Sequence, residues 1–151
     1  MGKFGVAAIT AVRIYTEGKV ATIPDAWGLA VQEIFPNSPS SQSKGCPKGT
    51  FLGICDSGCV IGVPSGEYTR SRKNKQYGLR ALELLCVTPS LADDEATLWQ
   101  LVLAGESRVP NSQMDVISSL WKAGLVDGTS KGQKLAVAYL PGTAVGGPSS
   151  N

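Results

Sequence analysis

The sequence has no histidine. This absence excludes a Ser-His-Asp triad, a Cys-His pair, an HExxH zinc site and an imidazole pH switch, because each of them needs an imidazole ring. No pair of carboxylates has a spacing typical of general acid–base catalysis, and the GxxxxGK[ST] spacing of a P-loop is missing as well. We therefore expect a non-enzymatic protein without a cofactor or a metal ion.

Charged residues and long apolar runs are also scarce. Asp, Glu, Lys and Arg make up 17% of the 151 residues, against about 25% in a typical domain, and the formal net charge is only +2. No run approaches the roughly 18 apolar residues of a membrane span, and no secretory signal is evident. Together with a mean hydropathy of +0.03, these features predict a soluble cytoplasmic protein with reduced thiols and no membrane contact.

The four cysteines include no CxxC pair, so the sequence has neither a zinc knuckle nor a thioredoxin-type motif. Cys46 is the one cysteine with a candidate chemical role. It is expected at a helix N-cap between Lys44 and Lys48, where the helix dipole and two ammonium groups would make its thiol nucleophilic. Because no histidine can act as its base, no residue is assigned as catalytic.

Two segments of the chain resemble each other, over residues 4–62 and 77–128. Similar residues occur in the same order in both, and the offset between them falls slowly along the chain. The matches are Phe4-Gly5 with Tyr77-Gly78, Trp27 with Trp99, Ser41-Gln42 with Ser112-Gln113, and residues 54–60 with 120–126. Two copies are too few for a solenoid. We expect a pseudo-twofold pair of helical units with one core, its tryptophans buried and its two matched glutamines bound to helix or loop backbone.

Each copy is predicted to form three helices, because apolar residues recur at helical spacing and Pro or Gly residues mark the ends. The predicted helices cover residues 4–16, 25–35, 47–58, 74–86, 93–103 and 111–122. Asp93, Asp94 and Glu95 would place negative charge at a helix start.

Residues 60–70 carry two β-prone runs around a Pro-Ser-Gly turn and predict a small β-hairpin, while residues 135–140 are a further strand candidate. The expected fold is mainly α, winged-helix-like, with a single domain over residues 1–140. A flexible tail is expected over residues 141–151, which are rich in Gly, Pro and Ser.

Basic residues are concentrated in the middle of the sequence. The stretch from Lys44 to Arg80 has a net charge of +5 and the remainder −3, an asymmetry typical of an anion-binding face. Six of these residues, here called the basic set, are the candidate nucleic-acid or anion ligands: Lys44, Lys48, Arg70, Arg72, Lys73 and Lys75. A helix at 47–58 followed by a hairpin also has the order of a winged helix, in which the helix enters a DNA groove. The alternative is an ordinary solvated loop and helix start.

Three stretches of the sequence are specific motifs rather than short generic patterns: SSQSKGCPKGTFLGICDSG, VPSGEYTRSRKNKQYGLRALELL and NSQMDVISSLWKAGLV. They resemble a bacterial family that is carried in genomes as a domain of unknown function. The resemblance covers most of residues 1–127. It implies no activity, ligand or catalytic residue, and the occurrence of similar proteins in bacterial chromosomes and mobile elements agrees with a cytoplasmic protein.

The sequence thus leaves three functions open. The first, which we expect, is a non-enzymatic binding module that contacts nucleic acid through the basic set by neutralising phosphates. The second is a protein–protein adaptor or phage-type inhibitor that meets an acidic partner. The third is a small thiol enzyme or anion-binding protein that uses Cys46.

Overall fold

The structure is a computed structural model, and it describes residues 1–127. Helices dominate these residues, so the predicted mainly helical fold is confirmed. The elements are α1 (Lys3–Thr16), α2 (Ile23–Ile34), α3 (Pro39–Gln42), α4 (Gly45–Asp56), α5 (Arg72–Val87), the 3-10 helix η1 (Pro89–Asp93), α6 (Glu95–Leu103) and α7 (Gln113–Lys122). The strand predicted over residues 135–140 and the tail over 141–151 lie outside the described residues.

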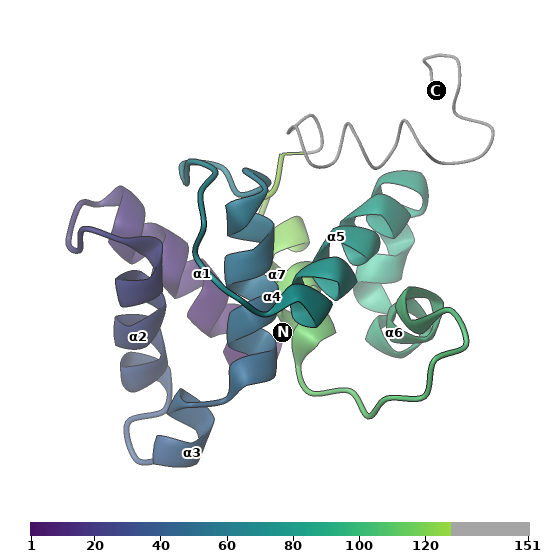
Figure 1. The fold of residues 1–151 in the computed structure, drawn as a ribbon, viewed down its shortest axis with the longest axis horizontal. Coiled ribbons are helices and arrows are strands. Elements are labelled where there is room, and N and C mark those ends of the chain that lie inside the picture. The colour runs from purple at the N-terminus through teal and green to yellow at the C-terminus, as the bar shows by residue number, and fades with distance from the viewer. Residues whose placement is uncertain (128–151) are drawn as a thin grey trace.

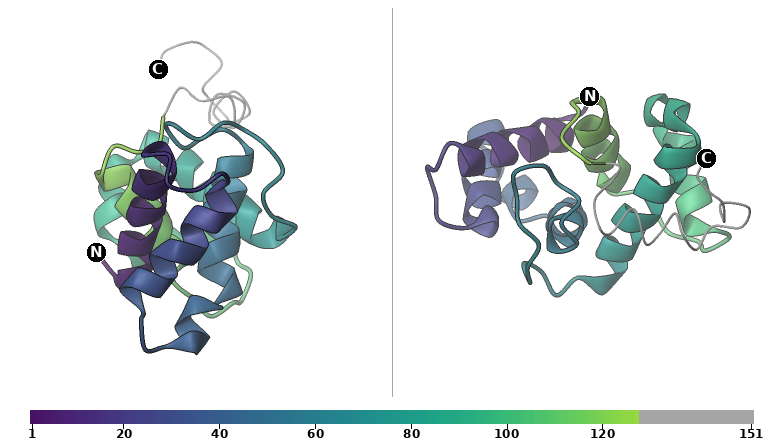
Figure 2. Two further views of the ribbon diagram at one scale, coloured as in Figure 1. Left: turned by 90° about the vertical axis from the view of Figure 1, so that its left-hand side faces the viewer. Right: turned by 90° about the horizontal axis from the view of Figure 1, so that it is seen from above.

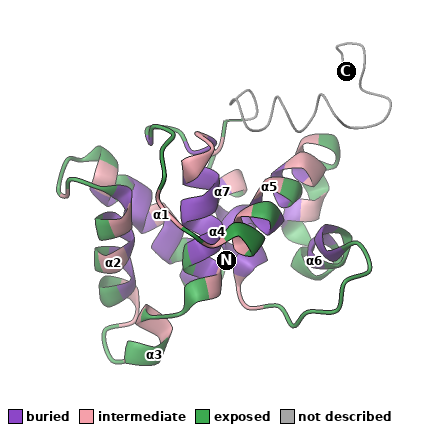
Figure 3. Ribbon diagram, in the orientation of Figure 1, coloured by how far each residue is buried: buried purple, intermediate pink, exposed green. Residues whose placement is uncertain are grey.

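α4 and α7 pack against each other in the centre of the molecule (Figure 1). α1 and α2 cover one side of this central pair, and α5 and α6 cover the other, as the view from above also shows (Figure 2). Burial is highest along the central helices (Figure 3). α4 packs on α5 and α7 packs on α1, so the third helix of each predicted half contacts the first helix of the other half. The two halves are interlocked rather than separate units.

The predicted β-hairpin over residues 60–70 is wrong. Within the part of the chain that the structure describes, the sole β-pairing is an isolated antiparallel bridge between Val60 and Val126. The segment that follows Val60 folds over the end of α4 instead, because the Tyr68 N–H donates a hydrogen bond to the Asp56 carboxylate. Without a hairpin these residues form no wing, so the winged-helix-like arrangement is not found either.

Two short helices, α3 and η1, were not predicted from the sequence. α3 begins at Pro39, which the sequence pattern treats as a helix stop, and η1 begins at Pro89. Proline is tolerated in a first helical turn, where the missing N–H has no partner to lose. The start of α5 is also two residues earlier than predicted, at Arg72, and that of α7 two residues later, at Gln113.

Trp27 and Trp99 are core residues, as predicted, with 2% and 3% of their surfaces exposed. Trp27 stacks on Phe51 with 5.2 Å between ring centroids, and Trp99 meets Tyr77 edge-on at 5.1 Å. Trp121 is half-buried and packs against the same core. Neither of these two indoles therefore presents a ring face to solvent on which a base could stack.

α1 and α7 cross at a buried carboxylate. Asp115, which is 7% exposed, accepts hydrogen bonds from the N–H groups of Gly2 and Gly5, both at 2.8 Å. It thereby pairs backbone donors that a helix start leaves unpaired, and its charge lies at the positive end of the α1 dipole. The crossing depends on the missing side chain of Gly5, because a Cβ atom there would lie 1.9 Å from the Ser119 Oγ.

We expect Gly5→Ala to lower the free energy of unfolding by about 1–3 kcal/mol, because the added methyl group overpacks the α1–α7 crossing. Gly28→Ala is the matched control on α2, since a Cβ atom there meets nothing within 4 Å, and it should stabilise the protein by up to about 1 kcal/mol through helix propensity. Urea unfolding followed by circular dichroism measures both. Changes of the same sign in the two variants would contradict the close crossing.

Candidate functional site

The basic set lies at two adjoining helix starts. Lys44 is the N-cap of α4 and Lys48 follows in its first turn, while the other four members precede or begin α5: Arg70, Arg72, Lys73 and Lys75. The two starts adjoin because Gly49 has no side chain. A Cβ atom at Gly49 would lie 2.7 Å from the Ser71 Oγ, directly before α5. The structure therefore brings together the two groups of basic residues that the sequence separates.

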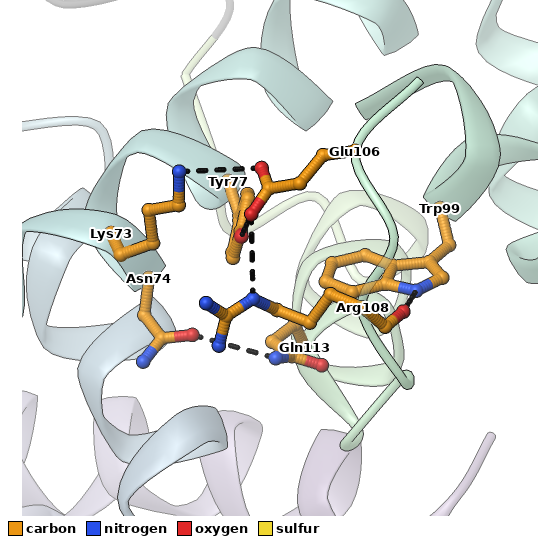
Figure 4. Close-up of polar contacts among 7 residues, drawn as sticks. All are labelled: Lys73, Asn74, Tyr77, Trp99, Glu106, Arg108 and Gln113. Atoms are coloured by element: carbon orange, nitrogen blue, oxygen red, sulfur yellow. Dashed lines mark hydrogen bonds and ion pairs between the residues drawn. The ribbon is translucent and has the colours of Figure 1, made fainter. Parts of the chain in front are cut away.

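The start of α7 lies beside the starts of α4 and α5. The Lys44 Nζ donates to the Asn111 Oδ1 at 3.2 Å, and the Gln113 Nε2 donates to the Asn74 Oδ1 at 3.4 Å (Figure 4). Asn111 and Gln113 belong to the start of α7, whereas Asn74 belongs to α5. Three helices thus begin side by side, and each contributes the positive end of its dipole.

None of these three helix starts has a side-chain cap. α2, α3 and α6 are each capped by a side-chain oxygen, from Thr22, Ser38 and Asp94. α4, α5 and α7 begin without such a bond. Backbone N–H groups at uncapped starts, next to basic side chains, favour the approach of an anion.

A pocket of about 430 Å³ opens beside the start of α5. Five charged side chains line it, those of Asp56, Glu67, Arg70, Arg72 and Lys75. The Lys75 Nζ lies 3.5 Å from the Asp56 carboxylate, so these two charges largely offset each other. Arg70 and Arg72 are exposed, and neither has an ion-pair or hydrogen-bond partner for its side chain within the described residues. Their guanidinium groups are the ones free to bind a phosphate or carboxylate bidentately.

Lys73 is engaged in a polar cluster over α5 (Figure 4). Its Nζ lies 3.3 Å from a Glu106 carboxylate oxygen, and the Arg108 Nε approaches the same carboxylate at 3.6 Å. The Tyr77 hydroxyl donates to Glu106 at 3.0 Å, and the Trp99 Nε1 donates to the Arg108 carbonyl at 3.1 Å. This cluster ties the segment between α6 and α7 to α5 and takes up part of the charge of Lys73.

Sequence patterns did not point to Arg108 or Asn111, since both lie in the segment between α6 and α7, outside the basic stretch in the middle of the sequence. The expectation for the two matched glutamines is confirmed. The Gln42 Nε2 donates to the Phe35 carbonyl at 2.7 Å, and the Gln113 Oε1 accepts from the Asn111 N–H at 2.6 Å. Gln113 thereby holds the start of α7 beside the basic set.

α4 does not present a groove-reading face, as the winged-helix comparison requires. Every residue from Gly49 to Cys55 is buried, and the Thr50 hydroxyl donates to the Cys46 carbonyl inside the helix at 2.8 Å. Of the three α4 side chains that could read bases, Lys48, Thr50 and Asp56, only Lys48 is exposed. The packing of α4 therefore leaves it no exposed face that could enter a groove.

Cys46 is the second residue of α4 rather than its N-cap. It is half-buried, and within residues 1–127 its thiol has no hydrogen-bond partner. Burial raises the pKa of the Cys55 thiol, with a further contribution from Asp56, and burial also raises the pKa of Cys86. The described part of the chain contains no group of three or more His, Cys, Asp or Glu residues that could hold a metal ion.

We expect the pKa of the Glu106 carboxyl to lie below that of an unperturbed glutamate, because the hydrogen bond from Tyr77 lowers it, with Lys73 adding to the effect. Since the folded-state pKa is the lower one, this stabilisation is present above the unfolded-state pKa and is lost as the pH falls through the folded-state value. Carboxyl NMR titration measures it. Tyr77→Phe should raise the midpoint of Glu106 and leave that of Asp94 unchanged, whereas an unchanged Glu106 midpoint would contradict the cluster.

Comparisons with known proteins place the chain in a family. Within residues 1–127 no helix is long and apolar enough to span a bilayer. No curated protein and no solved structure matches the sequence. Residues 1–127, the region that contains the three distinctive stretches, match the family of unknown function DUF6979, and the chain belongs to that family.

Proposed function

We propose that the chain is a non-enzymatic binding module that contacts nucleic acid through phosphate groups at the basic set. The observation that carries the proposal is the pair of exposed guanidinium groups, on Arg70 and Arg72, at the 430 Å³ pocket. This pocket adjoins the start of α5, which has no side-chain cap, and Asp56 at the end of α4. Guanidinium groups and helix starts are both common ligands of phosphate oxygens. We also propose that the protein is bacterial and cytoplasmic.

The proposed contacts go to the nucleic-acid backbone and not to the bases. The packing of α4 leaves no helix face for a groove, and Trp27 and Trp99 are buried. Phosphate contacts position a protein but carry no direct sequence information. Because Lys73 and Lys75 already face carboxylates, few phosphates would be neutralised. We therefore propose weak binding that depends little on sequence and strongly on salt.

Fluorescence anisotropy of a labelled duplex and a labelled single strand, at salt concentrations between about 50 and 200 mM, tests the proposal. Arg70→Gln with Arg72→Gln should weaken binding about tenfold at the lower salt concentration, because two phosphate contacts are lost. The slope of log affinity against log salt should become shallower by roughly one for each contact removed.

Arg13→Gln with Lys19→Gln is the matched control. These residues are exposed on and after α1, away from the basic set, and each already faces a glutamate. The control removes the same formal charge, so it should leave the affinity nearly unchanged. Absence of binding at the lowest salt concentration, or equal weakening by both double variants, would overturn the proposal.

A second candidate function is a protein–protein adaptor or phage-type inhibitor that meets an acidic partner. The observation that favours it is Val109, which is 82% exposed and follows Arg108 in the segment beside the basic set. Apolar and basic side chains together are typical of protein interfaces, in which arginine is enriched.

That Cys46 is a reactive thiol stays a prediction. It would be supported if Cys46 were alkylated much faster than Cys86.

We also propose that the two interlocked halves are copies of one unit. α4 and α7 are each followed by a glycine with positive φ, 73° at Gly58 and 71° at Gly124. The residue two positions after each glycine, Val60 or Val126, forms one half of the isolated β-bridge. Close helix approaches support the same relation, because a Cβ atom at Gly5 would meet α7 and one at Gly78 would meet α4.

A further inference from the structure

A second pocket lies between α6 and the start of α7, and its chemistry is opposite to that of the basic set. Its volume is about 350 Å³, far above the roughly 30 Å³ that one water occupies. The residues that matter for its chemistry are Glu95, Trp99, Gln100, Pro110, Met114 and Asp115. The pocket does not include any member of the basic set, so binding here would be independent of the proposed function.

One part of this pocket is apolar and fixed in place. Trp99 and Met114 are 3% and 4% exposed, and Pro110 lines the pocket with them. The indole cannot swing away, because its Nε1 donates to the Arg108 carbonyl at 3.1 Å and its ring packs edge-on against Tyr77. A preformed apolar wall of this kind suits a short hydrocarbon chain.

The other part of the pocket carries two carboxylates from different helices, Glu95 of α6 and Asp115 of α7. Asp115 is committed to the start of α1 through two hydrogen bonds and accepts a third from Ser119 on its own helix. Glu95 has no hydrogen bond or salt bridge within residues 1–127. Partial burial raises the pKa of Glu95 and Asp115 raises it further, while Lys122 and then the N-terminal ammonium group offset this less strongly. Lys122 is itself bound to Asp93 at 3.2 Å, so within residues 1–127 no cation forms a salt bridge with Glu95.

We propose that this pocket binds a small organic cation, a primary alkylammonium group whose carbon chain lies against Pro110 and the accessible edge of Trp99 and whose charge meets Glu95. The charge of the pocket selects a cation over an anion or a neutral molecule. A hard metal ion would need several oxygen ligands, whereas much of this lining is carbon. The ammonium group can belong to a free amine or to the lysine side chain of a protein, since both present the same chemistry.

NMR titration at constant ionic strength tests the site, with the indole N–H signal of Trp99 as the reporter, assigned by its loss in Trp99→Phe. The probe is n-pentylamine, with n-pentanol as its neutral analogue. The amine should give a saturable shift in the millimolar range, as expected for a ligand of about six heavy atoms. n-Pentanol should bind at least about fivefold more weakly, because it lacks the charge that Glu95 attracts.

Glu95→Gln should weaken amine binding by at least about fivefold, because it removes the direct charge contact. Glu33→Gln on α2 removes the same charge from an exposed position and should leave the affinity within about twofold. One further probe separates the two sources. Binding of blocked lysine, which is N-acetylated and C-amidated, supports a protein side chain as the natural ligand, whereas binding of n-pentylamine alone supports a small molecule.

The proposal is overturned if no saturable shift occurs, or if n-pentanol binds as well as the amine, which would indicate an apolar pocket without charge selection. Equal loss in Glu95→Gln and Glu33→Gln would overturn it as well, because the effect would then come from overall charge. So would an identical shift with magnesium chloride alone, since that result identifies an inorganic ion site.

Discussion

The carboxylate of Asp115 joins the first helix of the fold to the last. A buried charge is costly unless it is paired or fully hydrogen-bonded, and here the N–H groups of Gly2 and Gly5 satisfy it together with the Ser119 hydroxyl. The bond fixes the register of α7 on α1. Because α7 also packs on α4 and α5, the position of the central pair, and with it that of the basic set, depends on this one contact.

The first turn of α7 separates two sites of opposite charge. On one side Gln113 reaches Asn74 and keeps the starts of α4, α5 and α7 together. On the other side Met114 and Asp115 line the pocket with Glu95. The net charge of +2 is small although basic and acidic side chains are segregated on opposite sides of the first turn of α7. An anion would bind on one side and a cation on the other. Overall composition is a poor guide to partners when charges are segregated in this way.

Local signals in the sequence predicted what local physics controls. Helical spacing located the main helices, and the acidic run before α6 includes its cap, since the Asp94 carboxylate accepts from the Thr97 N–H. The hairpin failed because Asp56, on a different element, takes the Tyr68 N–H that strand pairing would have used. The concentration of basic residues was visible, but the partners of Lys73 and Lys75 are distant acids that no spacing reveals.

The packing of α1 on α7 has a consequence for the order in which the chain can fold. Gly2 and Gly5 are separated from Asp115 by 113 and 110 residues, so α1 leaves the ribosome long before its partner has been made. α2 can pack on α1 soon afterwards, but the side of α1 that carries Gly2 and Gly5 stays uncovered until α7 follows. Contacts of such long range form slowly and expose apolar surface meanwhile. A nascent chain that stops short of α7 would therefore expose the surfaces of α1, α4 and α5 that α7 covers in the finished protein.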